Sequence, residues 1–208
     1  MTTTAHNATI TAVDSVSHLT PERWAIANRH LVRKAIAEFS HERILVPEVI
    51  RAEEAGVSLY RVVSDDAATE YRFRARLLQL EHWSVSAESI VRVRDGEELP
   101  VDALDFIAEF HEALAIRQEM LPVYLEEISS TLASHAYKQG KPLSSAQLAA
   151  GITGGTDRAA DFQAIERSMT EGHPCFVANN GRLGFGIADY HAFAPETGAA
   201  IKLQWIAV

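Results

Sequence analysis

Apolar residues recur at helical spacing in the first part of the chain, after a polar start. The run Thr20-Pro21-Glu22 has the composition of a helix start, with a capping threonine, a proline at the first helical position and an acidic residue on the positive end of the helix dipole. Trp24, Leu31, Ala35 and Phe39 follow at helical spacing. This pattern predicts a helix from Thr20 to about Ser40.

The period changes to two in the middle of the chain, where apolar residues from Tyr71 to Leu77 alternate with Arg72, Arg74 and Arg76. Strict alternation is typical of a half-buried strand. Three further segments have strand composition, and Asp95-Gly96 closes the last of them as a turn: Leu59–Val63, His82–Val85 and Ile90–Val93. The connections are too short for crossover helices, so we expect an antiparallel meander of three or four strands.

Helical spacing returns after residue 100. The pattern predicts a long amphipathic helix over 101–120 and a second helix from Pro122 to about Lys138, which Gly140 ends. A short helix or turn is expected over 145–150. Thr156 is the expected cap of a last helix, over 157–170.

The final segment, 172–208, is rich in glycine and ends in the apolar run 200–208. This run has the pattern of a strand. An exposed apolar strand promotes association, so we expect it either to dock on a sheet of this domain or to belong to a longer protein.

Composition restricts the class of protein. Hydrophobic residues make up 47% of the 208 residues and charged residues 23%, which is enough for a packed core. The formal net charge of −9 argues against a nucleic-acid binder. A single cysteine, the absence of a basic, apolar leader and the lack of an apolar run of about 18 residues lead us to expect a cytoplasmic protein without a membrane partner.

Candidate chemistry concentrates in the segment 170–186, which places His173, Asn179, Asn180 and Arg182 in a glycine-rich loop after a helix. Such a loop can bring backbone N–H groups and a forked guanidinium to an anion. The alternative is an irregular loop with solvated polar groups.

Two other segments could bind anions, but their sequences favour simpler interpretations. The run 151–156 lacks the lysine of a phosphate-binding loop, so a turn leading to a helix cap is preferred. The row Arg72, Arg74 and Arg76 could clamp carboxylates, although the solvent face of a sheet is preferred.

No metal ligands are predicted from spacing. His41-Glu42 and His111-Glu112 each lack the second histidine of a zinc-binding helix. His30, His111 and His135 are interpreted as packed or exposed helix residues. Cys175 lies two residues from His173, and a nucleophilic pair is possible, but a buried structural thiol is preferred.

The loop and the C-terminal residues after it resemble the first signature block of the NRPS-independent siderophore (NIS) synthetases, the aerobactin synthase-like family. The similar residues are Glu171-Gly172-His173-Pro174, Arg182, Gly184-Phe185, Tyr190, Ala194-Pro195-Glu196 and 203–208. The opening segments 19–24 and 33–43 resemble the desferrioxamine synthetase branch. The wider family pattern has His-Pro at 176–177 and Lys at 180, where this chain has Phe176, Val177 and Asn180.

The resemblance implies an ATP-dependent ligase that uses ATP and Mg²⁺ to adenylate a carboxylate, which it then joins to an amine. In the desferrioxamine branch the substrate is the hydroxamate-succinate compound N-hydroxy-N-succinylcadaverine, which is oligomerised and cyclised to a trishydroxamate. His173, Asn180, Gly181 and Arg182 would then bind the nucleotide or the activated carboxylate. No catalytic residue is assigned.

The resemblance also implies the architecture and the partners. It indicates an α+β fold with a flexible arm (1–19), a thumb-like domain (20–170) and the start of the nucleotide-binding region (171–208), which ends in the first strand of a palm or fingers region. The protein is expected to form a homodimer and to need the C-terminal part of the same enzyme, without which it is expected to be inactive. The alternative is a non-catalytic dimerisation or interaction module.

Overall fold

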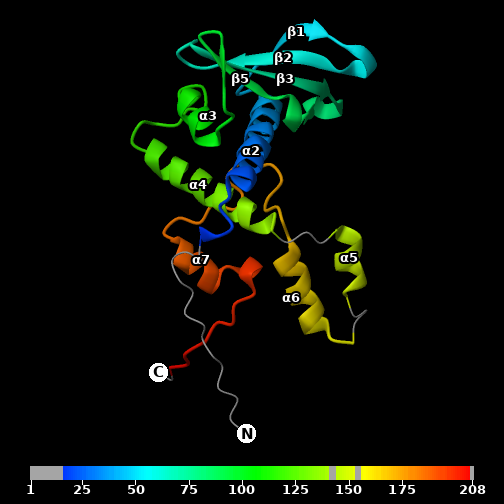
Figure 1. Cartoon of the computed structure of the whole chain (residues 1–208), viewed down its shortest axis with the longest axis vertical. Coiled ribbons are helices and arrows are strands. Elements are labelled where there is room, and N and C mark those ends of the chain that lie inside the picture. The colour runs from blue at the N-terminus through cyan, green and yellow to red at the C-terminus, as the bar shows by residue number, and fades with distance from the viewer. Residues whose placement is uncertain (1–15, 141–143, 153–155, 207–208) are drawn as a thin grey trace.

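The computed structural model describes residues 16–140, 144–152 and 156–206. An antiparallel sheet lies at one end of the molecule, and helices extend from it toward the opposite end (Figure 1). The predicted α+β fold with a small antiparallel sheet is confirmed.

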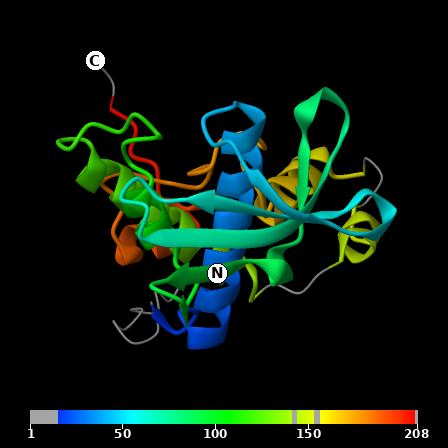
Figure 2. The same ribbon diagram turned by 90° about the horizontal axis from the view of Figure 1, so that it is seen from above.

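Helix α2 (Pro21–His41) is the central element, and it runs beneath the sheet (Figure 2). The Thr20 hydroxyl accepts a hydrogen bond from the Arg23 backbone N–H at 3.3 Å, as the predicted cap requires. Val32 and Ile36 are completely buried. The sequence therefore predicted this helix and its apolar face correctly.

The sheet has six antiparallel strands in the order β1-β2-β3-β5-β6, with β4 paired to β3. The strands are β1 (Glu48–Ala52), β2 (Ser58–Val63), β3 (Thr69–Leu77), β4 (Trp83–Val85), β5 (Val91–Arg94) and β6 (Glu97–Leu99). Four of them were predicted, together with the turn at Asp95-Gly96. The short edge strands β1 and β6 were missed.

Strand β3 is buried on one face only. Tyr71, Phe73 and Ala75 are buried, whereas Arg72 and Arg74 are exposed. Arg74 forms an ion pair with Glu53 at 2.8 Å, and Arg72 pairs with Glu70. The arginine row is thus the solvent face of the sheet, as the preferred interpretation had it.

The described part of the chain also contains helices that follow the sheet in sequence. They are α3 (Ala103–Glu109), α4 (Leu121–Lys138), α5 (Ser145–Ala150), α6 (Arg158–Ser168) and α7 (Ile187–Phe193). The 3₁₀ turns are η1 (Glu54–Gly56), η2 (Gln79–Glu81), η3 (Ala87–Ser89) and η4 (Pro195–Thr197). Helix α6 is capped by Asp157, whose carboxylate accepts from the Ala160 N–H at 3.0 Å, and not by Thr156. Residues 153–155 of the candidate turn 151–156 lie outside the described residues.

The predicted helix over 101–120 is wrong, because α3 ends at Glu109. The backbone N–H of Asp65 donates to the Glu109 carbonyl at 2.9 Å. The Asp65 carboxylate then accepts from the N–H groups of Glu112 at 2.7 Å and Ala113 at 3.2 Å. Asp65, which is far away in sequence, therefore accepts hydrogen bonds from backbone N–H groups that would donate to helix carbonyls if α3 continued.

The predicted terminal strand is also wrong for residues 201–206, which have no regular secondary structure. Leu203, Trp205 and Ile206 are 68%, 90% and 85% exposed. A strand needs a neighbour for its backbone groups, and none of the described strands pairs with this segment. Residues 207–208 lie outside the described residues.

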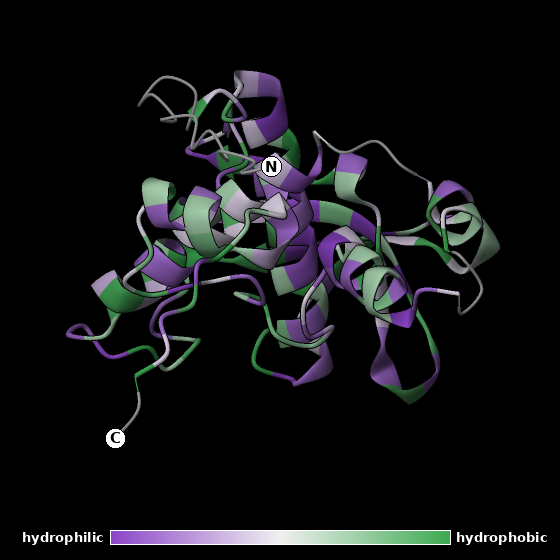
Figure 3. Cartoon of the chain, turned by 90° about the horizontal axis from the view of Figure 1, so that it is seen from below, coloured by the Kyte–Doolittle hydropathy of each residue, from purple (hydrophilic) through white to green (hydrophobic). Residues whose placement is uncertain are grey.

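The core lies between the sheet, α2, α3 and α4. Val177 and Ala178 from the last part of the chain join the same core, while the predicted domain boundary near residue 170 stays a prediction. Polar and apolar residues alternate along the helices at the opposite end from the sheet (Figure 3). Among the described residues, no helix is long and apolar enough to cross a membrane.

Candidate functional site

The candidate loop lies against α2 and α4, which hold it through polar contacts along its length. Lys34 of α2 donates to the His173 carbonyl at 3.3 Å, and Ser130 of α4 accepts from the Arg182 N–H at 3.1 Å. Within the loop, the Asn179 amide donates to the Glu171 carboxylate at 3.0 Å. The loop is therefore held by side chains of two helices.

Arg182 is the central cation of the site. Its Nη2 donates to both carboxylate oxygens of Glu196, at 2.8 and 3.0 Å, and its guanidinium lies 5.4 Å from the centre of the Tyr190 ring. Its Nη1 is buried and has no hydrogen-bond partner among the described residues. A buried guanidinium donor without a partner is a favourable place for an anionic oxygen.

Asn180 is buried and accepts a hydrogen bond from the Lys138 ammonium of α4 at 2.7 Å. The same ammonium lies 3.5 Å from Glu196. The loop has no lysine at position 180, but α4 brings an ammonium group to the Asn180 side chain. We call Lys138, Asn180, Arg182 and Glu196 the Arg182 group.

Burial and charge oppose each other in this group. Burial lowers the pKa of the Lys138 ammonium, although the Glu196 carboxylate counteracts it. Burial alone would raise the pKa of Glu196, but the hydrogen bonds and charge of Arg182 hold it below its usual range. Glu196 therefore carries its negative charge between two cations.

Gly181 has a steric role in the structure. A Cβ at this position would lie 2.9 Å from the Glu127 carbonyl oxygen of α4, closer than real side chains approach. The glycine thus allows the loop to pass close to the helix.

The remaining two loop residues with candidate chemistry lie apart from the Arg182 group. His173 is exposed, and it is the backbone carbonyl of this residue that contacts Lys34. Cys175 is also exposed, so the preferred interpretation of a buried structural thiol was wrong.

A cavity of about 320 Å³ lies beside Arg182. Its lining combines aromatic and apolar side chains with few polar ones, which is typical of small-molecule sites: His18, Leu19, Trp24, Glu126, Ser129, Ser130, Ala133, Arg182, Phe185, Gly186, Ile187 and Tyr190. Arg182 brings a guanidinium to this lining, a group that binds phosphate or carboxylate. Of these lining residues, Glu126 alone brings a carboxylate, which is fewer than Mg²⁺ usually requires.

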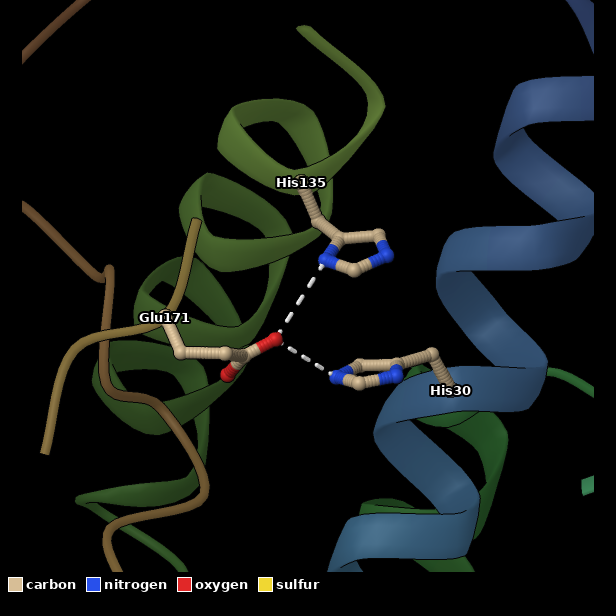
Figure 4. A group of neighbouring side chains, drawn as sticks. All are labelled: His30, His135 and Glu171. Carbon is tan, nitrogen blue, oxygen red and sulfur yellow. Dashed lines mark ion pairs between the residues drawn. The ribbon is translucent and has the colours of Figure 1, made fainter. Parts of the chain in front are cut away.

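A second cluster lies at the start of the loop (Figure 4), where His30 of α2, His135 of α4 and Glu171 converge. Glu171 Oε1 lies 2.8 Å from His30 Nε2 and 3.9 Å from His135 Nδ1. The two imidazole rings stack with their centres 4.4 Å apart. We call these three residues the histidine cluster.

The electrostatics of the histidine cluster favour a neutral imidazole beside a charged carboxylate. Burial, helped by the neighbouring His30, lowers the pKa of His135 to about 4. Burial alone would raise the pKa of Glu171, but its contacts with His30 and Asn179 prevail and lower it to about 2. At neutral pH, His135 is therefore uncharged and Glu171 is ionised.

Sequence reasoning missed the histidine cluster. More than a hundred residues separate His30 from His135, and tens of residues separate His135 from Glu171, so no sequence motif contains all three. Only the crossing of α2 and α4 brings them together. Lys138 was missed for the same reason.

The comparisons with known proteins point to one class. Residues 161–208 match the model of the IucA / IucC family. The homologues of this chain are siderophore synthetases.

Putrebactin synthase of Shewanella sp. (strain MR-4) is 45% identical over 92% of this chain and 29% of its own length. The rhizobactin siderophore biosynthesis protein RhbF of Rhizobium meliloti is 29% identical over 90% of this chain and 29% of its own length. The chain thus spans less than a third of the length of these relatives. The structure of aerobactin synthetase IucC from Klebsiella pneumoniae superposes on this chain with a TM-score of 0.67 at 23% sequence identity. The match covers 85% of this chain and 29% of the IucC chain, and it supports the fold.

Proposed function

We propose that this chain is part of a siderophore synthetase that uses ATP and Mg²⁺ to adenylate a carboxylate and to condense it with an amine. The observation that carries the proposal is the 45% identity to putrebactin synthase over 92% of the chain. As the relatives are more than three times longer, catalysis is proposed for the complete enzyme, and the segment alone is expected to be inactive.

The proposed substrate is N-hydroxy-N-succinylcadaverine, which the enzyme would oligomerise and cyclise to a desferrioxamine-type trishydroxamate. The proposal rests on the resemblance of 19–24 and 33–43, and of the variant residues Phe176, Val177 and Asn180, to the desferrioxamine branch. We also propose that the enzyme works as a homodimer in the cytoplasm.

In this proposal the Arg182 group binds the anionic part of the nucleotide or of the activated carboxylate. Arg182 lines the 320 Å³ cavity, and its buried Nη1 has no partner among the described residues. Glu196 fixes the other edge of the guanidinium, so the donor is oriented before the ligand arrives. His173 and Gly181 complete the proposed nucleotide-binding set with Asn180. The ligands of Mg²⁺ are proposed to come from the rest of the enzyme.

The test is turnover by the complete synthetase with ATP, Mg²⁺ and N-hydroxy-N-succinylcadaverine, followed by mass spectrometry of the hydroxamate products and by release of AMP. Arg182→Ala should lower kcat/KM by at least about 100-fold, as expected for loss of a charged donor. Arg72→Ala is the matched control, because that arginine lies on the solvent face of the sheet. Normal turnover by Arg182→Ala would exclude the proposed role of the loop. Absence of any ATP-dependent product from the wild-type enzyme would exclude the substrate.

A further inference from the structure

Three side chains of different elements direct metal-ligating atoms toward one point: His30 of α2, His135 of α4 and Glu171 of the loop (Figure 4). One donor atom from each lies within 4.8 Å of the others. We propose that the histidine cluster binds one divalent transition-metal ion, of the kind represented by Zn²⁺ and Co²⁺. This site is separate from the Mg²⁺ and ATP chemistry of the proposed function.

The donor set fits such an ion. Two imidazole nitrogens and one carboxylate oxygen are typical ligands of Zn²⁺ and Co²⁺, whereas Mg²⁺ prefers oxygen ligands alone. Two ligand atoms bound at about 2.1 Å to one tetrahedral ion lie about 3.4 Å apart, and neither lies on the other's lone-pair axis. Glu171 Oε1 and His30 Nε2 are 2.8 Å apart, yet Nε2 has no partner of hydrogen-bond geometry among the described residues.

The third ligand needs a small adjustment. His135 Nδ1 lies 3.9 Å from Glu171 Oε1, which is less than 1 Å beyond the spacing expected around one ion. Both histidines are on well-packed helices, while Glu171 is on the loop. A rotation of the Glu171 carboxylate and of one imidazole ring would bring the three ligand atoms to bonding distance of one ion without moving a helix.

Neighbouring groups orient the carboxylate. Asn179 donates to Glu171 Oε2 at 3.0 Å, and the Lys34 ammonium lies 3.6 Å from the same oxygen. Oε1 is therefore left to face the two imidazole rings. Such contacts around a ligand fix its direction and strengthen metal sites.

The site has room for an ion and is open to solvent. The cluster lines a cavity of about 10 Å³, near the volume that one water molecule requires. The side chains of His30, His135 and Glu171 are 29%, 17% and 41% exposed, so an ion can enter without unfolding.

Lys34 opposes the ion. Its side chain is 5% exposed and its ammonium lies close to Glu171, so it raises the electrostatic cost of adding a divalent cation. Lys34→Gln should tighten metal binding, because it removes a positive charge beside the ligand set.

The experiment titrates the purified protein, freed of metal with a chelator, with Co²⁺ and with Zn²⁺. We expect one bound ion per chain by calorimetry, visible absorption bands of protein-bound Co²⁺, and a rise in Tm with Zn²⁺ because the ion binds the folded state. His135→Ala and Glu171→Gln should each weaken Zn²⁺ binding by at least about tenfold. Lys34→Gln should strengthen it.

The matched control is His82→Ala. His41 and His82 form a second stacked pair, with ring centres 4.2 Å apart, but they are not part of a group of three possible ligands among the described residues. This variant should bind Zn²⁺ like the wild type. Circular dichroism of each variant without metal separates loss of folding from loss of the ion.

The proposal is overturned if the wild type binds neither ion with a Kd below about 100 μM. It is also overturned if a folded His135→Ala variant keeps wild-type affinity. Because this experiment needs no ATP and no siderophore substrate, its failure would leave the proposed synthetase activity untouched. Loss of turnover in Arg182→Ala would likewise say nothing of the metal.

Discussion

The backbone at Gly172 passes closer to Asn179 than any residue with a side chain could. A Cβ at position 172 would overlap the Asn179 carbonyl oxygen. This contact joins the two ends of the loop, since Asn179 also donates to Glu171. The glycine thus determines where the metal-ligand candidate Glu171 lies.

Gly172→Ala should therefore destabilise the protein by about 1–3 kcal/mol, because the loop must open to admit the methyl group. Urea unfolding measures this loss. Gly151→Ala is the control, since a Cβ at position 151 would lie 3.4 Å from the Leu148 carbonyl oxygen, which is an ordinary van der Waals distance. Equal stabilities of the two variants would contradict the predicted clash.

At this scale the sequence singled out a candidate loop, whose role stays a prediction, but not the partners of its residues. His173, Asn180 and Arg182 were recognised because polar and basic residues stood in a glycine-rich segment. Their partners Lys138 and Lys34 belong to helices, where lysine is an ordinary surface residue. Burial of these two ammonium groups, at 6% and 5% exposure, results from packing that no local pattern encodes.

Among the elements, α3 shows how a distant side chain decides where a helix ends. The apolar positions of 101–120 continue at helical spacing, so the pattern alone could not reveal the stop. Asp65 provides both a donor for Glu109 and an acceptor for the N–H groups of residues 112 and 113. Predicted helices with local caps, such as α2, were placed correctly.

Asp65→Ala should cost about 1–3 kcal/mol in the free energy of unfolding, because two backbone donors lose their acceptor. Hydrogen exchange at Glu112 and Ala113 should become faster than in the wild type. Asp65→Asn keeps an acceptor oxygen, and its loss should be smaller. Unchanged exchange in Asp65→Ala would show that the helix ends there for another reason.

The molecule as a whole depends on ionic contacts that join its last segment to α4. Glu196 follows α7, yet it contacts Arg182 of the loop and Lys138 of α4. Sequence patterns predicted α2, α4, α5, α6 and strands β2 to β5, because each follows from local periodicity, but they made α3 too long and missed α7, β1 and β6. They could not predict the contacts of Glu196 with Arg182 and Lys138, because these depend on which distant segments meet. For the same reason they could not predict that 201–206 lacks a partner strand among the described strands.

The pKa of Glu196 is lowered in the folded protein, so the unfolded chain takes up more protons as the pH falls below the usual carboxyl range. The contribution of Glu196 to stability is full above about pH 4.5 and is lost below it. Glu196→Gln should cost about 3 kcal/mol at pH 7, because two cations lose their partner. Its stability should then fall less between pH 6 and pH 3.5 than that of the wild type.

Urea unfolding at the two pH values measures this difference. The control is Glu97→Gln, because the Glu97 side chain is exposed on β6. The control should follow the wild-type pH dependence. A Glu196→Gln variant that lost as much stability as the wild type would contradict the prediction.

The hydrogen bond between Lys138 and Asn180 links the charges that these two positions can carry, because it brings an ammonium group against a neutral amide. The Asn180 amide oxygen accepts a hydrogen bond from the Lys138 ammonium at 2.7 Å, so a lysine at 180 beside the present Lys138 would bring two like charges together. A chain of this fold with lysine at 180 should therefore carry an uncharged or acidic residue at 138. The two positions are expected to change together during evolution, with the positive charge moving from the helix to the loop while the site keeps its total charge.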